Sequence, residues 1–283
     1  MEVSNETDLH AIDKALTPWR QGDCVLGEHW FLFRIALNAP ITEEAAQAAV
    51  EGVDAGEADV RGFMVATQTC DIIRSCADRH FVEVCPLEEV DANKLDEIQR
   101  GRRPNYAFIS GVAENALVAD LDRVMTVEKA VLASWDRVQG CHDDDEVRRL
   151  AMALARKRSR FAFPDDFVKL ASKLQDRMSS KHSKESDEGR ALRALREIRV
   201  RATPSWDADH IEITLLFIPN KDEPNFDKQG WAQYLEAWLD RVPESGRFET
   251  IVGLIQTLDD LTARDYVESD PLDLDHLSRP ATP

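Results

Sequence analysis

GFMVATQTCD, residues Gly62–Asp71, is the stretch of sequence on which the expected fold depends most. It opens with apolar and β-branched residues, a composition typical of a buried strand. The polar residues at its end predict that the strand stops at Thr69. The carboxylate of Asp71 is then expected to form an Asx-turn or a helix cap at the exit.

Neighbouring segments extend the same pattern on both sides. Residues 24–37 (CVLGEHWFLFRIAL) predict one or two strands, and His80–Leu87 (HFVEVCPL) predicts another that Pro86 stops. Residues 41–59 are polar and rich in alanine, and they predict a surface helix with Thr42 as its N-cap. The first half is therefore expected to be β-rich with one helical insertion.

The second half has a different pattern. The polar loop Cys141–Glu146 is the best candidate boundary, and it divides the chain into residues 1–140 and 147–283. A basic helical segment follows the loop, and the last third is expected to run β-β-α-β. The predicted fold class is α+β, with a C-terminal α+β sheet domain after the basic helical middle.

Composition limits the classes of function. Hydrophobic residues make up 43% of the chain, yet no apolar run reaches the roughly 20 residues of a membrane span. The acidic N-terminus lacks the apolar stretch of a signal peptide, so a cytoplasmic location is expected. The five cysteines show no disulfide spacing and are expected to be reduced thiols.

Charge is distributed unevenly along the chain. The net charge is −18, which argues against a general nucleic-acid binder. Residues 148–203, however, hold 16 Lys and Arg against 7 Asp and Glu, out of 35 and 53 in the whole chain. Two explanations stay open: pairing of this segment with acidic residues of the protein, or a phosphate-binding face. For the second explanation, the candidate ligands of phosphate are Arg156, Lys157, Arg158 and Arg160.

The order of elements in residues 20–138 resembles that of the MazF/PemK family. Gly22-Asp23 stands where the family's first strand opens, and Arg61 stands at its Arg-Pro strand. The third and fourth strands correspond to residues 80–87 and 103–110. The closest match is ALVADLDRVMTVEKAVL, residues 116–132, which has the register of the family's last strand and helix.

This resemblance implies an SH3-like β-barrel in residues 1–140 and an RNase activity that needs no metal. Arg61 would be the catalytic arginine and would stabilise the developing phosphorane charge. Glu88 falls near the family's expected threonine, and there it would repel the phosphate unless it acts as the base. Gly62 replaces the family's proline. The binding cleft of such a barrel would lie at the strand exit, which consists of Gln68, Thr69, Cys70 and Asp71.

Cysteine and histidine residues near this exit allow two further chemistries. Cys70, Cys76, His80 and Cys85 are ligand types for zinc, but their spacing differs from the usual pairs, and small buried hydrophobes explain these cysteines more simply. Cys70 could instead be a nucleophile with His80 as its base, although the adjacent Asp71 disfavours a thiolate.

Three weaker patterns lie in the second half. Arg177 and His182 have the spacing of the HEPN ribonuclease pair, and Glu188, Glu197 and Arg199 loosely match a restriction-like metal nuclease. Solvated helix faces explain both patterns better. Asp270, Asp273 and Asp275 are interpreted as surface acids.

Two functions remain at this stage. The first is a non-catalytic subunit of a prokaryotic toxin–antitoxin or phage-defence-like system, which binds nucleic acid or a protein partner. The second is a metal-independent endoribonuclease of the MazF/PemK type that uses Arg61. A protein partner encoded nearby is expected, with RNA or DNA on the basic middle segment and a homodimer as open alternatives. No cofactor and no metal is expected.

Overall fold

The chain folds into two compact units, each with its own sheet. The computed structural model describes residues 6–99, 101, 103–159, 161–182, 184–219 and 228–272. The first unit comprises Met1–Ser159 and the second comprises Arg160–Pro283. The fold is thus α+β with two sheets, and the strands described in the first unit do not close into a barrel. Within the described residues, no helix is long and apolar enough to cross a membrane.

The first unit is built on a six-stranded sheet in the order β1-β2-β3-β5-β4, with β6 also paired to β3. Its strands are β1 (Cys24–Arg34), β2 (Ala55–Val65), β3 (Phe81–Glu89), β4 (Tyr106–Phe108), β5 (Leu117–Asp120) and β6 (Met125–Glu128). Its helices are α1 (Glu6–Leu16), α2 (Glu43–Val50), α3 (Thr69–Ile72), α4 (Ala92–Gln99), the 3₁₀ helix η1 (Ser110–Asn115), α5 (Lys129–Ala133) and α6 (Asp144–Arg158).

Strand β3 belongs to both halves of this sheet. Its first residues pair with β6 and its last residues pair with β5. Pro86 lies between these two stretches and opposite Phe63 of β2. The expectation that Pro86 stops the strand is therefore wrong, because at this position the pairing changes from one partner strand to the next and a missing N–H is tolerated.

Three hydrophobic clusters lie in the described part of this unit, a small one around Ile98 and two larger cores. One gathers Met64, Cys85 and Leu87 with Leu150 of α6, and the other gathers Phe63 and Val84 with side chains of α1, α3 and α5. Because Leu150 is buried in the first core, α6 belongs to the first unit. The division therefore falls after Ser159, rather than within the predicted loop at residues 141–146.

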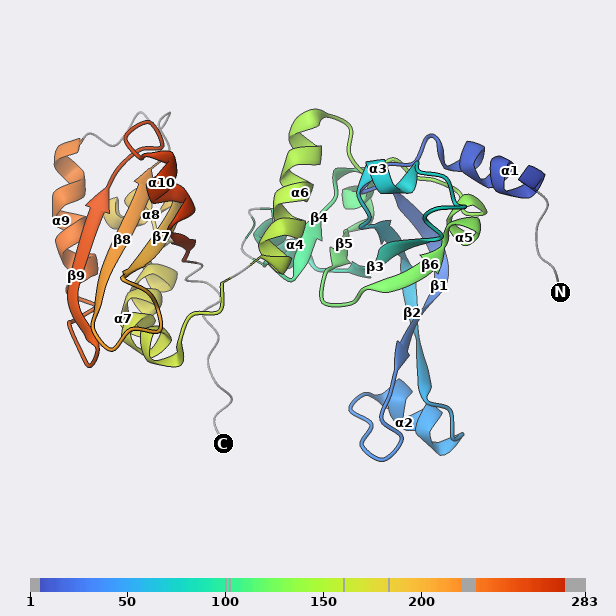
Figure 1. Ribbon diagram of the computed structural model, residues 1–283, viewed down its shortest axis with the longest axis horizontal. Helices are drawn as coiled ribbons and strands as arrows, with labels where there is room; N and C mark the ends of the chain where they lie inside the picture. The colour runs from blue at the N-terminus through green and yellow to red at the C-terminus, as the bar shows by residue number, and fades with distance from the viewer. Residues whose placement is uncertain are drawn as a thin grey trace. The chain divides into compact units, whose positions relative to one another are not determined.

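Hairpin β1–β2 extends well beyond the cores as an arm, with α2 at its tip (Figure 1). Thr42 caps α2 as predicted, since its hydroxyl accepts the Ala45 N–H at 3.2 Å. Gly62 pairs with Leu26 at the edge of a bulge between Leu26 and His29, and no proline can adopt its φ of +138°. The backbone at this position therefore requires a glycine rather than a proline.

The second unit confirms the predicted β-β-α-β order. Strands β7 (Leu195–Thr203), β8 (Ile211–Pro219) and β9 (Phe248–Ile255) form a sheet with the short β10 (Asp270–Pro271) in the order β10-β7-β8-β9. Strands β8 and β9 are parallel, and α9 (Lys228–Leu239) connects them. The other helices are α7 (Asp165–His182), α8 (Asp187–Ala194) and α10 (Ala263–Val267).

Candidate functional site

A cleft of about 600 Å³ lies at the base of the arm, and it contains both residues predicted to be catalytic. Arg61 comes from β2 and Glu88 from β3, and exposed Trp30 of β1 lines the same cleft. We call this the acidic cleft because carboxylates outnumber guanidinium groups among its lining residues, which include Glu28, Asp59, Glu88, Glu89, Arg61 and Arg123.

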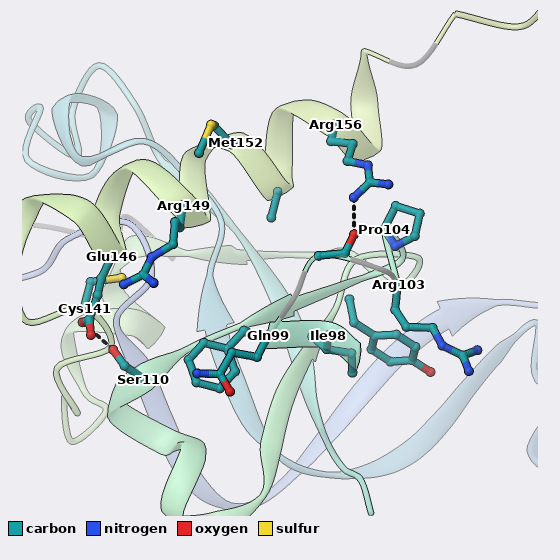
Figure 2. Close-up of a pocket in the computed structure, with 14 residues that line it drawn as sticks. Ile98, Gln99, Arg103, Pro104, Ser110, Cys141, Glu146, Arg149, Met152 and Arg156 are labelled. Carbon is teal, nitrogen blue, oxygen red and sulfur yellow. Dashed lines mark hydrogen bonds between the residues drawn. The ribbon is translucent and has the colours of Figure 1, made fainter. Parts of the chain in front are cut away.

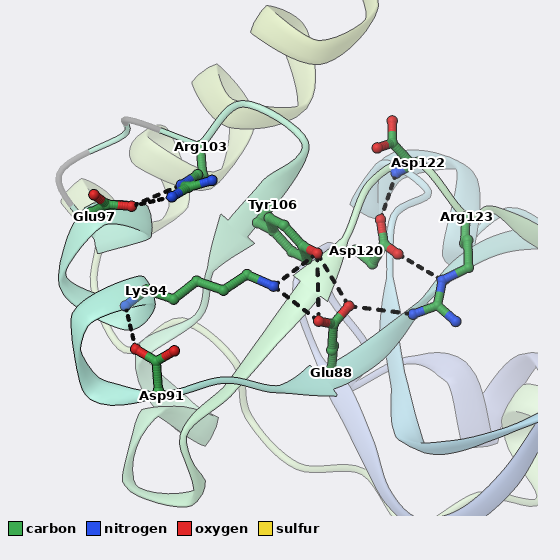
Figure 3. Close-up of polar contacts among 9 residues, drawn as sticks. All are labelled: Glu88, Asp91, Lys94, Glu97, Arg103, Tyr106, Asp120, Asp122 and Arg123. Atoms are coloured by element: carbon green, nitrogen blue, oxygen red, sulfur yellow. Dashed lines mark hydrogen bonds and ion pairs between the residues drawn. The ribbon is translucent and has the colours of Figure 1, made fainter. Parts of the chain in front are cut away.

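The carboxylate of Glu88 is engaged on both oxygens (Figure 3). Lys94 donates to its Oε1 at 3.0 Å, and the Tyr106 hydroxyl lies 3.2 Å from its Oε2. Arg123 reaches Oε2 at 3.5 Å and also pairs with Asp120 at 2.6 Å. The ammonium of Lys94 lies 4.2 Å above the ring centre of Tyr106. Glu88 therefore connects β3 to α4, β4 and the β5–β6 turn.

Arg61 is held much more loosely. Its side chain is 66% exposed, and its ion pair with Glu89 spans 3.8 Å. A guanidinium in this position could contact an incoming anion. The carboxylates that line the same cleft, however, would repel a polyanion that approached Arg61.

A second cleft, of about 720 Å³, lies beside the Gln68–Asp71 turn. Gln68 and Asp71 line it together with Arg158 of α6, so three of the predicted binding residues meet here. We call it the turn cleft. Exposed Phe81 and Arg79 also line it, and among the residues that the structure describes the Arg79 guanidinium has no hydrogen bond or ion pair.

The turn itself differs from the prediction. Strand β2 ends at Val65 rather than Thr69, and residues 69–72 form the short helix α3. Asp71 does not cap this helix, because Gln68 occupies the N-cap position. Contacts from distant segments explain the difference: Gln21 N–H donates to the Thr69 hydroxyl at 3.1 Å, and buried Lys129 donates to the Asp71 carbonyl at 2.9 Å.

The cysteine chemistries find no support in the geometry. Cys70 is exposed and its thiol lies 3.7 Å from the Gln68 amide oxygen, whereas His80 Nδ1 contacts the Cys76 carbonyl at 2.6 Å. Burial raises the pKa of Cys85 to about 12. Across the described ranges, no group of three or more His, Cys, Asp or Glu side chains could hold a metal ion.

The cations of the basic middle segment are largely paired within their own unit. Arg156 donates to the Gly101 carbonyl, Lys157 pairs with Asp122, and Arg158 reaches Glu83 at 2.7 Å. Arg160 lies outside the described residues. The cations of this segment that contact a carboxylate are Arg148, Lys157, Arg158, Arg177, Arg190, Arg193, Arg196, Arg199 and Arg201. The pairs with Asp145, Asp122, Glu83 and Asp265 join the segment to acids outside it, so internal pairing offsets part of its excess positive charge.

Carboxylates of the second unit serve as structural partners. Glu188 accepts from Arg177 at 2.6 Å and from the buried Trp238 at 3.2 Å. Glu197 pairs with Arg199 at 3.2 Å. Because Glu188 and Arg177 pair with each other, Glu188 is not free to bind a metal as in a restriction-like nuclease. Arg177 is likewise not free to act as in a HEPN ribonuclease. Of the three C-terminal acids, Asp270 accepts from Trp206 at 3.3 Å, while Asp273 and Asp275 lie outside the described residues.

Two features were not predicted from the sequence. The arm, residues 35–60, contains six acidic residues and no Lys or Arg, a signal that a local charge count would have found. The second feature is a cluster of Ser110, His142 and Glu146. Ser110 donates to the Glu146 carboxylate, which lowers the pKa of Glu146. Both groups face the same imidazole nitrogen, His142 Nδ1, at 3.3 Å, so a catalytic relay through the ring is not formed.

The structure thus divides the predicted residues between two clefts and several ion pairs. Arg61 and Glu88 meet in the acidic cleft, and Gln68, Asp71 and Arg158 meet in the turn cleft. No protein-family model, curated protein or solved structure significantly matches this chain. Geometry and charge are therefore the grounds for proposing a function.

Proposed function

We propose that this protein is a non-catalytic binding subunit of a prokaryotic toxin–antitoxin or phage-defence-like system, and that its arm and acidic cleft bind a basic segment of a protein partner. The resemblance to the MazF/PemK family supports the biological setting. The charge and exposure of the arm support the type of partner.

We infer that the first unit is a remote and open variant of the SH3-like barrel. Support comes from the antiparallel β1–β2–β3 meander and from the division of β3 between two partner strands. The isolated bridge between Cys24 and Val138 adds the chain after α5 to the edge of β1. This arrangement leaves the outer half of the β1–β2 hairpin free to serve as an arm.

One observation carries the binding proposal: the arm combines unbalanced negative charge with exposed apolar side chains. Its acidic residues are Glu43, Glu44, Glu51, Asp54, Glu57 and Asp59, of which Asp54 pairs with Arg34 of β1. Ile41 and Val50 near the tip are 96% and 89% exposed, and Trp30 and Leu32 are exposed along β1. A surface of this kind complements a partner that carries Lys or Arg among apolar residues.

The acidic cleft continues this surface at the base of the arm. Asp59 and Glu28 add negative charge beside Trp30, whose ring can pack against the stem of a lysine or the plane of an arginine. The same charges disfavour a nucleic-acid backbone, which needs clustered cations. A protein segment is therefore the better ligand for this cleft.

Co-purification with the protein encoded beside it tests the proposal. The wild-type chain should retain that protein, whereas Glu57→Lys with Asp59→Lys should release it, because two attractive charges become repulsive. The control is Glu212→Lys with Glu236→Lys in the second unit, which changes the net charge equally at exposed positions. Equal retention by both double variants would refute the assignment of the arm.

The endoribonuclease remains a second candidate, favoured by the presence of Arg61 and Glu88 in one cleft. If it is correct, incubation with total RNA in EDTA should give discrete fragments, and Arg61→Ala should abolish them. We expect intact RNA at high protein concentration, since both Glu88 oxygens are already engaged and carboxylates surround Arg61.

A further inference from the structure

A third cavity, of about 290 Å³, lies in the first unit between α6 and described residues of α4, of β4 and between them, among them Gln99, Gly101 and Arg103. Arg149 and Arg156 extend from α6 over the cavity, with Gln99, Ile98 and Arg103 on the opposite side (Figure 2). We call it the helix groove. It shares no lining residue with the acidic cleft or the turn cleft.

Most of the groove's surface is apolar. Tyr106 and Phe108 of β4 contribute two aromatic rings, and Ile98, Met152 and Ala153 contribute aliphatic groups. Met152 is exposed although it lines this cavity. Aromatic rings and a polarizable thioether form a favourable environment for a flat ring. The volume is at the lower end of the roughly 300–1,000 Å³ of small-molecule sites, which suits a single ring system with a substituent.

The charges around the groove are mainly positive, in contrast to the whole chain. Arg103 pairs with Glu97 at 2.7 Å, and Arg156 donates to the Gly101 carbonyl. The side chain of Arg149 has neither a hydrogen bond nor an ion pair within the described part of the chain. The lining carboxylate, Glu146, lies at one end, where Ser110 and the His142 backbone N–H already donate to it.

Arg149 and Arg156 are seven residues apart on α6, so they stand about two turns, or roughly 10 Å, from each other on one side of the helix. A guanidinium presents paired N–H donors that match phosphate oxygens. The groove thus places an unengaged phosphate donor beside an apolar surface that fits a flat ring. An uncharged ring would leave Arg149 unused, and an inorganic anion would leave the aromatic lining unused.

We propose that the helix groove binds a nucleoside monophosphate, with its base against the apolar lining and its phosphate on Arg149. This inference goes beyond the proposed binding of a protein partner and does not depend on it. The ligand is a single nucleotide rather than a strand, because the cavity is small.

Isothermal titration of the full chain with each of the four ribonucleoside 5′-monophosphates tests this proposal. At least one should bind more tightly than its nucleoside and more tightly than inorganic phosphate, because base and phosphate contribute together. Arg149→Gln should weaken that binding by about tenfold or more, which corresponds to about 1.4 kcal/mol.

The matched control is Arg148→Gln, since Arg148 is the neighbouring cation and is exposed and paired with Asp145 at 3.1 Å. Its affinity should stay within about twofold of the wild type. Thermal unfolding followed by circular dichroism verifies that both variants fold. The proposal is overturned if none of the four nucleotides binds, if both variants weaken binding equally, or if inorganic phosphate binds as tightly as the best nucleotide.

Discussion

At the scale of single residues, the contacts of a side chain decide whether it can act on a ligand. Glu88 and Arg61 were both candidates for chemistry, and they lie in the same cleft. Glu88 is held by Lys94, Tyr106 and Arg123, whereas Arg61 makes one long ion pair. Glu88 is therefore expected to stabilise the fold, and Arg61 is expected to be available for binding.

Replacing Glu88 by glutamine should lower the free energy of unfolding by about 1–2 kcal/mol, because the amide turns one acceptor into a donor facing cations. The control is Glu89→Gln, because the Glu89 side chain is 65% exposed and its ion pair with Arg61 is long, at 3.8 Å. That variant should stay within about 0.5 kcal/mol of the wild type. Urea unfolding measures both values. Equal losses would show that Glu88 has no special structural role.

Asp166 gives the second unit a predicted dependence on pH. Hydrogen bonds from Arg247, at 2.6 and 3.0 Å, hold the pKa of Asp166 below its usual value. The unfolded chain then binds a proton more readily, so this contact stabilises the fold above the unfolded pKa of about 3.9 and is lost as pH falls through the lower folded pKa.

Urea unfolding of the wild type and Asp166→Asn over a range of pH measures this effect. The wild type should be the more stable at neutral pH, and the difference should shrink below about pH 4. Asp165→Asn is the control, since Asp165 forms no ion pair within the described residues, and its effect should be smaller. A difference between wild type and Asp166→Asn that is constant down to pH 2 would contradict the assigned cause.

At the scale of elements, the hairpin β1–β2 is the feature that positions the binding surface. The base of the hairpin, where β1 begins and β2 ends, contributes side chains to both cores, and its outer part extends from the unit as the arm (Figure 1). The bulge beside the Leu26–Gly62 pair lies near the base. The backbone at this glycine is therefore expected to control the stability of the hairpin.

Gly62→Ala should destabilise the chain by more than about 2 kcal/mol, because φ is +138° and the new Cβ would lie 2.0 Å from the Val25 carbonyl oxygen. The control is Gly52→Ala in the arm, where φ is +73° but nothing lies within 4 Å. It should cost about 1 kcal/mol, the price of the backbone conformation alone. Melting temperatures of the two variants measure the contrast, and similar temperatures would contradict it.

Composition and capping residues in the sequence predicted where helices and strands form more accurately than where β2 ends and turns. The strand at residues 24–34, the Thr42 cap and the β-β-α-β order of the last third were all predicted, because composition and capping are local. The end of β2 was not, since Gln21 and Lys129 shape the turn from far along the chain. Of the acidic cleft, only Arg61 and Glu88 were predicted as site residues. Its other walls come from β1 and from the β5–β6 turn, which are distant in the sequence.

At the scale of the whole molecule, the net charge of −18 is not spread evenly over the surface. The basic middle segment is partly neutralised, because Lys157, Arg158 and Arg201 pair with carboxylates that lie outside the segment. The arm has less compensation, since residues 35–60 contain six acids and no Lys or Arg, although Asp54 pairs with Arg34 of β1. The uncompensated part of the charge therefore marks the surface where we expect a basic partner.

Titration of the partner encoded alongside into the wild-type chain and the two double variants, at about 50 mM and 200 mM salt, tests this claim most directly. We expect the wild-type affinity to fall as salt rises, and Glu57→Lys with Asp59→Lys to lose about tenfold or more at low salt. The control, Glu212→Lys with Glu236→Lys, should bind like the wild type. Equal affinity of the arm variant and the control, at both salt concentrations, would contradict the central claim.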